Sequence, residues 1–438
     1  MLYVLFIFEF VLFLQAFILS NKDILAPTCT MSIVFIISTF ACILNIDNWN
    51  INFSIETTLI IILGLLSFLL AELSIIWRYR YKKLCYYNLK KLIANDFSPI
   101  DFSLTVIMLL FIVNIATSVW YYQEITRIVG AYNFFSGNIL HSFRVVSTNE
   151  QFSGESINFF LNQILKFVKG ESYALLYIFI RNMFVGSIHK KKNIVLLLTL
   201  IASIVPTILT GARGGILQLL SAAAIFIYIV WHQKLGWDRN LSYKFLKWSI
   251  LALIVFAPIF YFSTFWIGRT INTELFSYLS IYVGSGIEGF NLYVGDRVST
   301  PRYFGEETFL GLRGVLQSWG LAGYVGTPFL EVRSMNGHLT NIYTFFRRPD
   351  HDFGLLGMCI FTFLVSFLLS IIYYKEVKFG DYRKNTTYVL TYGYLYYWII
   401  YSSLEQWSQT IISLTMLMPI FFMIFTYNIL RFIKIKIV

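Results

Sequence analysis

Apolar segments of roughly 17–22 residues recur along the chain, and each is long enough to cross a lipid bilayer as a helix. The chain has 438 residues, of which 57% are hydrophobic and only 13% are charged. An ordinary soluble protein carries about 25% charged residues. The sequence therefore predicts an all-α polytopic membrane protein and excludes an ordinary soluble enzyme.

Eleven segments are predicted to be transmembrane helices. They cover residues 2–19, 31–46, 58–77, 104–121, 172–188, 193–209, 215–231, 248–266, 353–374, 388–404 and 411–430. The first segment has no charged residues before it and no small-residue cleavage site, so we expect a retained helix rather than a cleaved signal peptide.

The predicted helices divide the chain into five parts. These are helices 1–4 (residues 1–121), an external loop (122–171), helices 5–8 (172–266), a large external loop (267–352), and helices 9–11 with a cytoplasmic tail (353–438). In the large loop, residues 307–320 have apolar side chains at helical spacing, which predicts an amphipathic helix on the membrane surface. Residues 273–294 also predict a helix, interrupted by Gly284-Ser-Gly286.

Lysine and arginine residues predict which side of the membrane each loop faces. Five basic segments lie near residues 78–91, 190–192, 234–244, 375–384 and 431–436. Alternating the eleven helices places all five on one side, which the positive-inside rule identifies as cytoplasmic. The large loop, the loop 122–171 and the turn 211–215 then face outward. This pattern also accounts for the net charge of +11 without a nucleic-acid partner.

The large loop contains seven arginines and not one lysine. They are Arg269, Arg297, Arg302, Arg313, Arg333, Arg347 and Arg348. The planar guanidinium group binds phosphate or carboxylate through two hydrogen bonds, so this composition predicts an anion site. The alternative is pairing with nearby acidic residues, which we expect for about half of them. Arg269, Arg347 and Arg348 lie near predicted helix ends, where they can reach lipid headgroups.

A further arginine, Arg213, lies in the short turn Thr-Gly-Ala-Arg-Gly-Gly at residues 210–215. An arginine at a helix end can simply extend its head group into water. The predicted outward position is unusual for arginine, however, and the neighbouring glycines allow a ligand to approach closely. We therefore expect Arg213 to bind a lipid phosphate.

Candidates for acid–base chemistry on the outer side include Glu307, His338 and Asp352. Asp352 opens a predicted span and can alternatively cap that helix. The chain has four cysteines, at positions 29, 42, 85 and 359, and their scattered spacing supports neither a metal site nor a disulfide framework. We expect no metal and no cofactor.

The order of these motifs resembles the O-antigen polymerases (Wzy), which polymerise oligosaccharide repeat units of bacterial surface polysaccharides. The resemblance rests on the turn at residues 210–215, on Asn-Ile-Tyr-Thr at 341–344, and on Asp-Phe-Gly-Leu-Leu-Gly at 352–357. It covers most of the chain from about residue 104 onward. The related O-antigen ligases have a His-Asn pair where this chain has Thr340-Asn341, and the missing histidine favours the polymerases.

The resemblance implies a membrane glycosyltransferase of the bacterial inner membrane whose active site faces the periplasm. Its substrates would be two undecaprenyl diphosphate-linked oligosaccharides, a donor and an acceptor, and a chain-length regulator is a further candidate partner. Arg213 and Arg347 would then act catalytically by stabilising the diphosphate leaving group, and Arg269 and Arg348 would bind substrate.

The same resemblance suggests roles for the remaining candidates. Asp352, Glu307 or His338 would activate the acceptor hydroxyl. Asn341 and Tyr343 would contact sugar or shape the loop. Two alternatives remain: a ligase that transfers the glycan to another acceptor, and a transporter or flippase of lipid-linked oligosaccharide. The transporter is disfavoured because the sequence shows no internal repeat.

Overall fold

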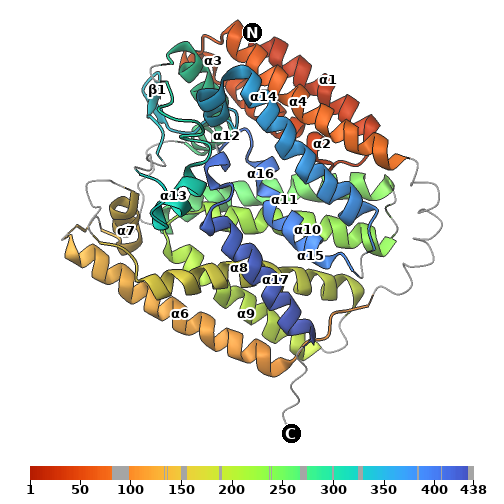
Figure 1. The fold of residues 1–438 in the computed structure, drawn as a ribbon, viewed down its shortest axis with the longest axis vertical. Helices are drawn as coiled ribbons and strands as arrows, with labels where there is room; N and C mark the ends of the chain where they lie inside the picture. The colour runs from red at the N-terminus through yellow and green to blue at the C-terminus, as the bar shows by residue number, and fades with distance from the viewer. Residues whose placement is uncertain are drawn as a thin grey trace.

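The structure is a computed structural model of a helical bundle with a smaller layer of loops and short helices at one end (Figure 1). It describes residues 1–432 except 81–97, 133, 136, 149–154, 187–189, 236, 238, 267–273, 298–299, 324–328, 382–383 and 406.

Within this described part, eight helices are long and apolar enough to cross a membrane. They are α1 (Leu2–Leu19), α2 (Pro27–Leu44), α4 (Ile55–Arg80), α6 (Leu104–Ala131), α9 (Lys190–Leu209), α10 (Gly214–Leu235), α14 (Arg347–Ile371, continued by the π-helix η3, Ile372–Lys378) and α17 (Leu414–Phe432). Each overlaps one predicted span, so a multi-pass membrane protein is supported.

The other three predicted spans correspond to elements outside this set. They are α8 (Phe159–Val185), α11 (Arg239–Trp266) and the pair α15 (Thr386–Leu395) and α16 (Tyr397–Ile400). Charged residues such as Lys166, Lys169 and Glu171 interrupt the apolar character of α8. The pair α15–α16 is a broken helix rather than one continuous span. The number of eleven spans therefore stays a prediction.

Basic residues gather at one end of the bundle, which we call the basic end. Lys192 Nζ lies 2.8 Å from Asp101 Oδ1, just before α6. Lys234 donates to the carbonyl of Phe184, near the end of α8, and Lys378 pairs with Asp23 in the α1–α2 turn. These contacts join segments that the sequence predicted to share one side of the membrane.

The opposite end, which we call the loop end, carries the large loop. Here α3 (Ile46–Trp49), α7 (Ile139–Thr148), α12 (Leu275–Gly295), α13 (Leu310–Ser318) and η4 (Trp407–Thr410) join the bundle helices. Arg297 bridges Glu56 at the start of α4 and Asp350 at the start of α14. The amphipathic helix predicted at 307–320 is confirmed in α13, although it is shorter.

The loop end also contains a hairpin that the sequence analysis missed. Strands β1 (Arg333–Met335) and β2 (His338–Thr340) pair in antiparallel register, with Met335 opposite His338. The turn is Asn336-Gly337, and both residues have positive φ. An Asn-Gly pair between short strands is a strong hairpin signal, so the sequence contained the information.

The predicted interruption of the helix at Gly284-Ser-Gly286 is wrong, because α12 continues through it. Both glycines instead permit close packing. A side chain at Gly284 would meet Ala41 and Trp49, and one at Gly286 would meet the carbonyl of Ser403. The glycines therefore let α12 lie directly against α2 and against the segment that follows α16.

The start of α14 is broken at Gly354, where φ is +65° and ψ is −176°. Glycine adopts this conformation readily, whereas other residues rarely do. The break separates the first turns, which carry Arg347, Arg348 and Asp352, from the apolar part of the helix. The polar side chains of these turns can consequently face the loop end while the span enters the bundle.

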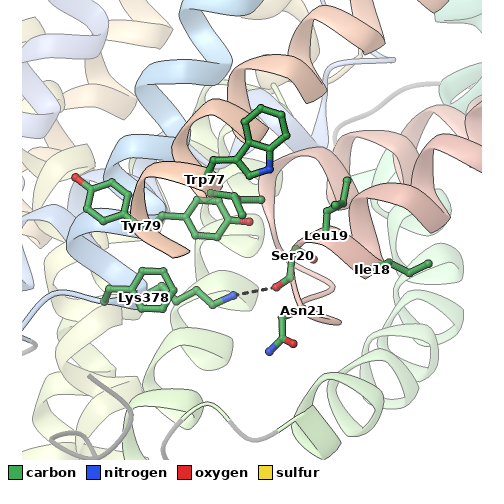
Figure 2. A pocket seen from close by; sticks show the side chains of 10 residues that line it. Ile18, Leu19, Ser20, Asn21, Trp77, Tyr79 and Lys378 are labelled. Carbon is green, nitrogen blue, oxygen red and sulfur yellow. Dashed lines mark hydrogen bonds between the residues drawn. The ribbon is translucent and has the colours of Figure 1, made fainter. Parts of the chain in front are cut away.

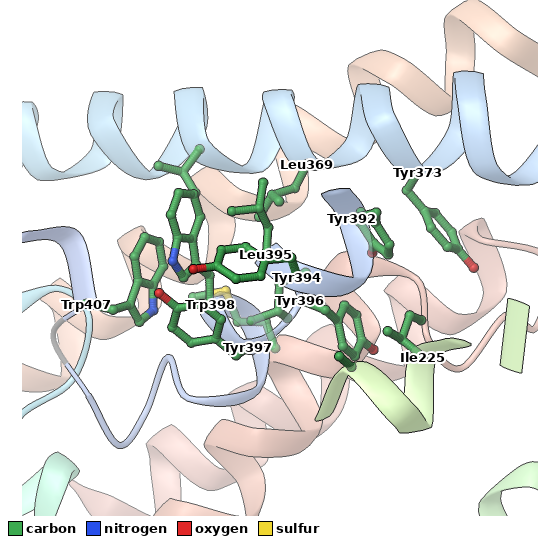
Figure 3. Packing of buried hydrophobic residues seen from close by; sticks show 14 of the residues in the cluster. Ile225, Leu369, Tyr373, Tyr392, Tyr394, Leu395, Tyr396, Tyr397, Trp398 and Trp407 are labelled. Carbon is green, nitrogen blue, oxygen red and sulfur yellow. The ribbon is translucent and has the colours of Figure 1, made fainter. Parts of the chain in front are cut away.

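The segment between α16 and α17, residues 401–413, folds back into the protein. The backbone N–H of Phe345 donates to the carbonyl of Ser402 at 2.7 Å. The ring of Trp407 stacks between Phe345 and Trp398, with both centroid distances at 4.5 Å. Figure 3 shows Trp398 and Trp407 beside the tyrosines of α15 and α16. This stack fixes the non-helical segment against the start of α14.

We expect Gly170→Ala to destabilise the contact between α8 and α17. A Cβ atom at Gly170 would collide with the carbonyl oxygen of Pro419, and overpacking of this kind costs roughly 1–3 kcal/mol. Gly130→Ala on α6 is the control, because nothing lies within 4 Å of its Cβ position. Thermal unfolding in detergent should show a lower Tm for Gly170→Ala alone, and equal values would contradict this packing.

Candidate functional site

A cluster of charged side chains at the loop end is centred on Arg347. Its guanidinium donates to Glu307 at 3.0 Å and to Glu331 at 3.1 Å, and it lies 3.8 Å above the ring centroid of Tyr293. His351 Nε2 lies 3.7 Å from the other oxygen of Glu307. Arg347 is buried, so its charge is neutralised mainly by these two carboxylates. This geometry favours a structural clamp over a phosphate site.

Asp352 also holds the large loop in place. Its carboxylate accepts the backbone N–H groups of Glu307, at 3.1 Å, and of Thr308, at 2.6 Å. The sequence raised the possibility that Asp352 caps its own helix, but the residue binds a different segment instead. Because the backbone already occupies this carboxylate, the geometry favours a positioning role over proton transfer.

The structure brings Arg347, Arg348, Glu307 and Asp352 together at the start of α14. Arg348 is fully buried and donates to the carbonyl of Glu307 at 3.3 Å. Arg269 lies outside the described residues.

Among the described residues, four of the seven loop arginines lie within 4 Å of a carboxylate. They are Arg297, Arg302, Arg333 and Arg347. The expectation that about half pair with acidic residues is therefore confirmed.

Arg213 has a different environment. Its guanidinium donates to the carbonyl of Phe260 and to the hydroxyls of Thr264, Tyr278 and Tyr282, at distances from 2.6 to 3.1 Å. The guanidinium carbon lies 4.0 Å from the ring centroid of Phe260. No carboxylate of the described residues lies within 4 Å of it. Arg213 is thus a fixed cation held by neutral groups, and its charge is available to an anion.

A large apolar groove begins beside Arg213. Its volume is about 880 Å³, near the upper limit of roughly 1,000 Å³ for small-molecule sites. Its walls come from α2, α10, α11, α12 and the end of α16. Three residues that line the groove connect it to Arg213. Leu217 lies one helical turn after Arg213, Ile259 precedes Phe260, and Val283 follows Tyr282, and both Phe260 and Tyr282 bind the Arg213 guanidinium. The arginine therefore marks the loop end of the groove.

The remaining predicted residues lie in or just after the hairpin. His338 is partly exposed in β2, and Asn341 is exposed. Tyr343 is fully buried, and its hydroxyl donates to the carbonyl of Glu331 at 2.8 Å. Of the two roles suggested for Tyr343, this geometry favours shaping the loop. The hairpin tip contacts α3 through Asn336, which donates to the carbonyl of Asn48.

Two residues that the sequence analysis did not select, Glu405 and Lys169, carry opposite charges that act on each other. Glu405 is exposed to solvent. Burial nevertheless raises the pKa of its carboxyl, while the positive charges of Lys169 and Arg348 lower it in part. The sequence signal for Glu405 was weak, because it is a single charged residue in the short polar link between two predicted spans.

A smaller pocket of about 230 Å³ lies at the basic end. Figure 2 shows Lys378, Ser20, Trp77 and Tyr79 around it. Lys378 pairs with Asp23 and donates to the carbonyl of Ser20. This internal ion pair accounts for much of the polar character of the pocket, which we do not include in the candidate site.

No protein-family model, no curated protein and no solved structure significantly matches this chain. The candidate site therefore rests on the chain's own residues. Its components are the Arg213 cation, the apolar groove, and the charged groups around the start of α14.

We expect Arg347→Ala to loosen the large loop, because it removes the cation that lies between Glu307 and Glu331 and leaves Glu331 with the more distant Arg333, at 3.8 Å. The loss of charged hydrogen bonds should lower the free energy of unfolding by about 2 kcal/mol. Arg302→Ala is the control, since the side chain of Arg302 is 74% exposed. Limited proteolysis should cut the large loop faster in Arg347→Ala, and equal rates for both variants would contradict a clamp.

Proposed function

We propose that this protein polymerises lipid-linked oligosaccharide repeat units. It would transfer the glycan from one undecaprenyl diphosphate carrier to the repeat unit on another, at the outer face of the bacterial inner membrane. The observation that carries the proposal is the position of Arg213 at the loop end of a long apolar groove. An apolar lipid tail and an anionic diphosphate head require this combination of surfaces.

Burial in the groove would drive binding of the isoprenoid tail. Its walls are mostly aliphatic, and removing apolar surface from water contributes roughly 25 cal/mol per Å². The diphosphate would then lie beside Arg213. Negative charge develops on the diphosphate as the glycosidic bond to it breaks, and a fixed guanidinium stabilises that charge without having to reorganise.

The neighbouring hydroxyls give Arg213 its orientation. Tyr278 and Tyr282 come from α12, whereas Thr264 comes from α11. Two helices therefore hold one cation, and Gly214, whose Cβ position has nothing within 4 Å, leaves space on the side of the turn. Because these partners are neutral, they position the guanidinium without a carboxylate from the described residues.

A ligase and a flippase remain as alternatives, and the phenotype of cells that lack the protein separates them. Loss of a polymerase should leave surface core carrying a single repeat unit. Loss of a ligase should leave long lipid-linked polymer that is not attached, and loss of a flippase should leave no repeat unit on the surface. Gel analysis of surface and lipid-linked glycans distinguishes the three patterns.

The direct test uses the full chain in lipid nanodiscs. The substrate is lipid-linked repeat unit purified from host cells that lack this protein. We expect glycan longer than one repeat unit to accumulate on the lipid, detected by gel electrophoresis. If the wild-type protein, folded and incubated with this substrate, forms no longer glycan, the proposed polymerase function is wrong.

Arg213→Ala should reduce the polymerisation rate about 100-fold, a typical loss when one group that stabilises a developing oxyanion is removed. Arg213→Lys should restore only part of the rate, because an ammonium group lacks the two-pronged geometry. Arg302→Ala again serves as the exposed arginine control. A rate for Arg213→Ala within twofold of the control would remove the central support for the proposal.

Ala224→Phe tests the groove separately from the cation. Ala224 lines the groove on α10, so a phenyl ring would occupy space that the proposal assigns to the isoprenoid tail. We expect less co-purifying polyprenyl lipid, measured by native mass spectrometry, and a higher KM. The control is Ala131→Phe at the exposed end of α6. Equal lipid retention in both variants would place the tail elsewhere.

A further inference from the structure

Four apolar side chains are uncovered near the start of α14, and we call them the apolar edge. Phe304 is 80% exposed, Leu356 is 75% exposed and Leu355 is 42% exposed, while Phe353 is partly exposed. Phe304 belongs to the large loop, whereas the other three lie on either side of the break at Gly354. A concentration of exposed apolar side chains marks a contact with another surface.

Ring contacts hold Phe304 against α14. The centroid of its ring lies 4.7 Å from that of Phe353 and 6.3 Å from that of Phe309. The ring of Phe309 in turn lies 5.8 Å from that of Phe353 and 6.1 Å from that of Phe361, further along α14. The exposed ring of Phe304 is therefore fixed at the side of this helix.

The apolar edge continues into an exposed aliphatic face of α14. This helix is long and apolar enough to cross a membrane. Every fourth residue along one of its faces is a large aliphatic side chain that is at least half exposed: Leu356, Ile360, Leu364 and Leu368. Residues four apart share one face of a helix. Lipid covers such a face in a spanning helix, so the apolar edge forms the end of a lipid-facing surface.

A cation lies beside the apolar edge. The guanidinium carbon of Arg313 lies 3.5 Å from the ring centroid of Tyr303, the residue before Phe304. Aromatic side chains gather where a membrane meets water, and an arginine there keeps its charged group among the lipid phosphates. From Arg313 through Tyr303 and Phe304 to Leu356, polarity falls as it does from a phospholipid headgroup to its acyl chains.

We propose that the apolar edge inserts into the outer leaflet of the membrane, with Phe304 among the upper acyl chains and Arg313 at the level of the phospholipid phosphates. The large loop is then anchored to the membrane surface beside α14. This contact does not depend on the proposed polymerase function.

The membrane contact differs from the one that the sequence predicts. Residues 307–320 predict an amphipathic helix whose apolar side faces the membrane. In the structure, Leu310 of α13 is buried, and a Cβ atom at Gly311 would meet the carbonyl oxygen of Gln409. Part of the apolar side of α13 thus packs on the protein, and the lipid contact passes to Phe304, which precedes the helix.

Photo-crosslinking in the full chain tests this contact. p-Benzoylphenylalanine replaces Phe304, and the protein is placed in nanodiscs of phosphatidylcholine and phosphatidylglycerol. The same substitution at Leu339 is the matched control, because this residue is 70% exposed in the hairpin and pairs with the exposed Ser334. After irradiation we expect at least about tenfold more phospholipid adduct at position 304, since acyl chains surround one probe and water the other.

The probe at Leu356 is the positive control, because this side chain lies on the exposed face of the span. Mass spectrometry identifies the adduct at each position. Phospholipid adducts at 304 and 356 but not at 339 support the anchor. Equal lipid adducts at 304 and 339, an adduct at 356 without one at 304, or an adduct of position 304 with a second protein chain would each overturn it.

The unsubstituted chain gives a second measurement, which decides the matter if a substituted chain does not fold. A phosphatidylcholine with a diazirine near the carboxyl end of one acyl chain labels the side chains at that depth. We expect label on the peptide that contains Phe304 and Phe309, and none on the peptide that contains the hairpin at 333–340. Absence of label from the first peptide, with label present on α14, contradicts insertion of Phe304.

Discussion

The guanidinium group of Arg347 joins parts of the chain that would otherwise be independent. It links the first turn of α14 to Glu307, to Glu331 and to the ring of Tyr293 on α12. Its burial makes this pairing necessary, because an uncompensated guanidinium away from water is strongly unfavourable. The large loop is thereby fixed over the start of α14, and the segment that carries Phe345 is fixed with it.

Phe345 connects the start of α14 to the interior of the protein. Its backbone N–H binds the carbonyl of Ser402, and its ring stacks on Trp407. Segment 401–413 is consequently held between α14 and the bundle, although its described residues form turns and the short helix η4 rather than an α-helix. The same segment contributes Tyr401, Ser403 and Leu404 to the wall of the apolar groove. One interrupted helix thus supplies part of the wall of the groove that our proposal assigns to the donor lipid.

The candidate site was only partly predictable from the sequence. Arg213 could be selected from the sequence, since a glycine-rich turn containing arginine on the predicted outer side is visible there. Arg347 was selected as a phosphate ligand, yet its geometry favours a clamp. Its partners Glu307 and Glu331 lie 40 and 16 residues away in the chain, a pairing that no local pattern reveals. Glu405 was missed because a single acid in a short link resembles an ordinary solvated residue.

The sequence by itself determined the class of protein and the grouping of its basic segments at one end. Both follow from local properties, because the length and hydrophobicity of a segment decide whether it can cross a bilayer, and flanking lysines decide its orientation. Only the tertiary structure decided which charges are neutralised and which remain available. That distinction depends on contacts between distant segments: Arg347 meets two carboxylates, whereas Arg213 meets neutral groups among the described residues.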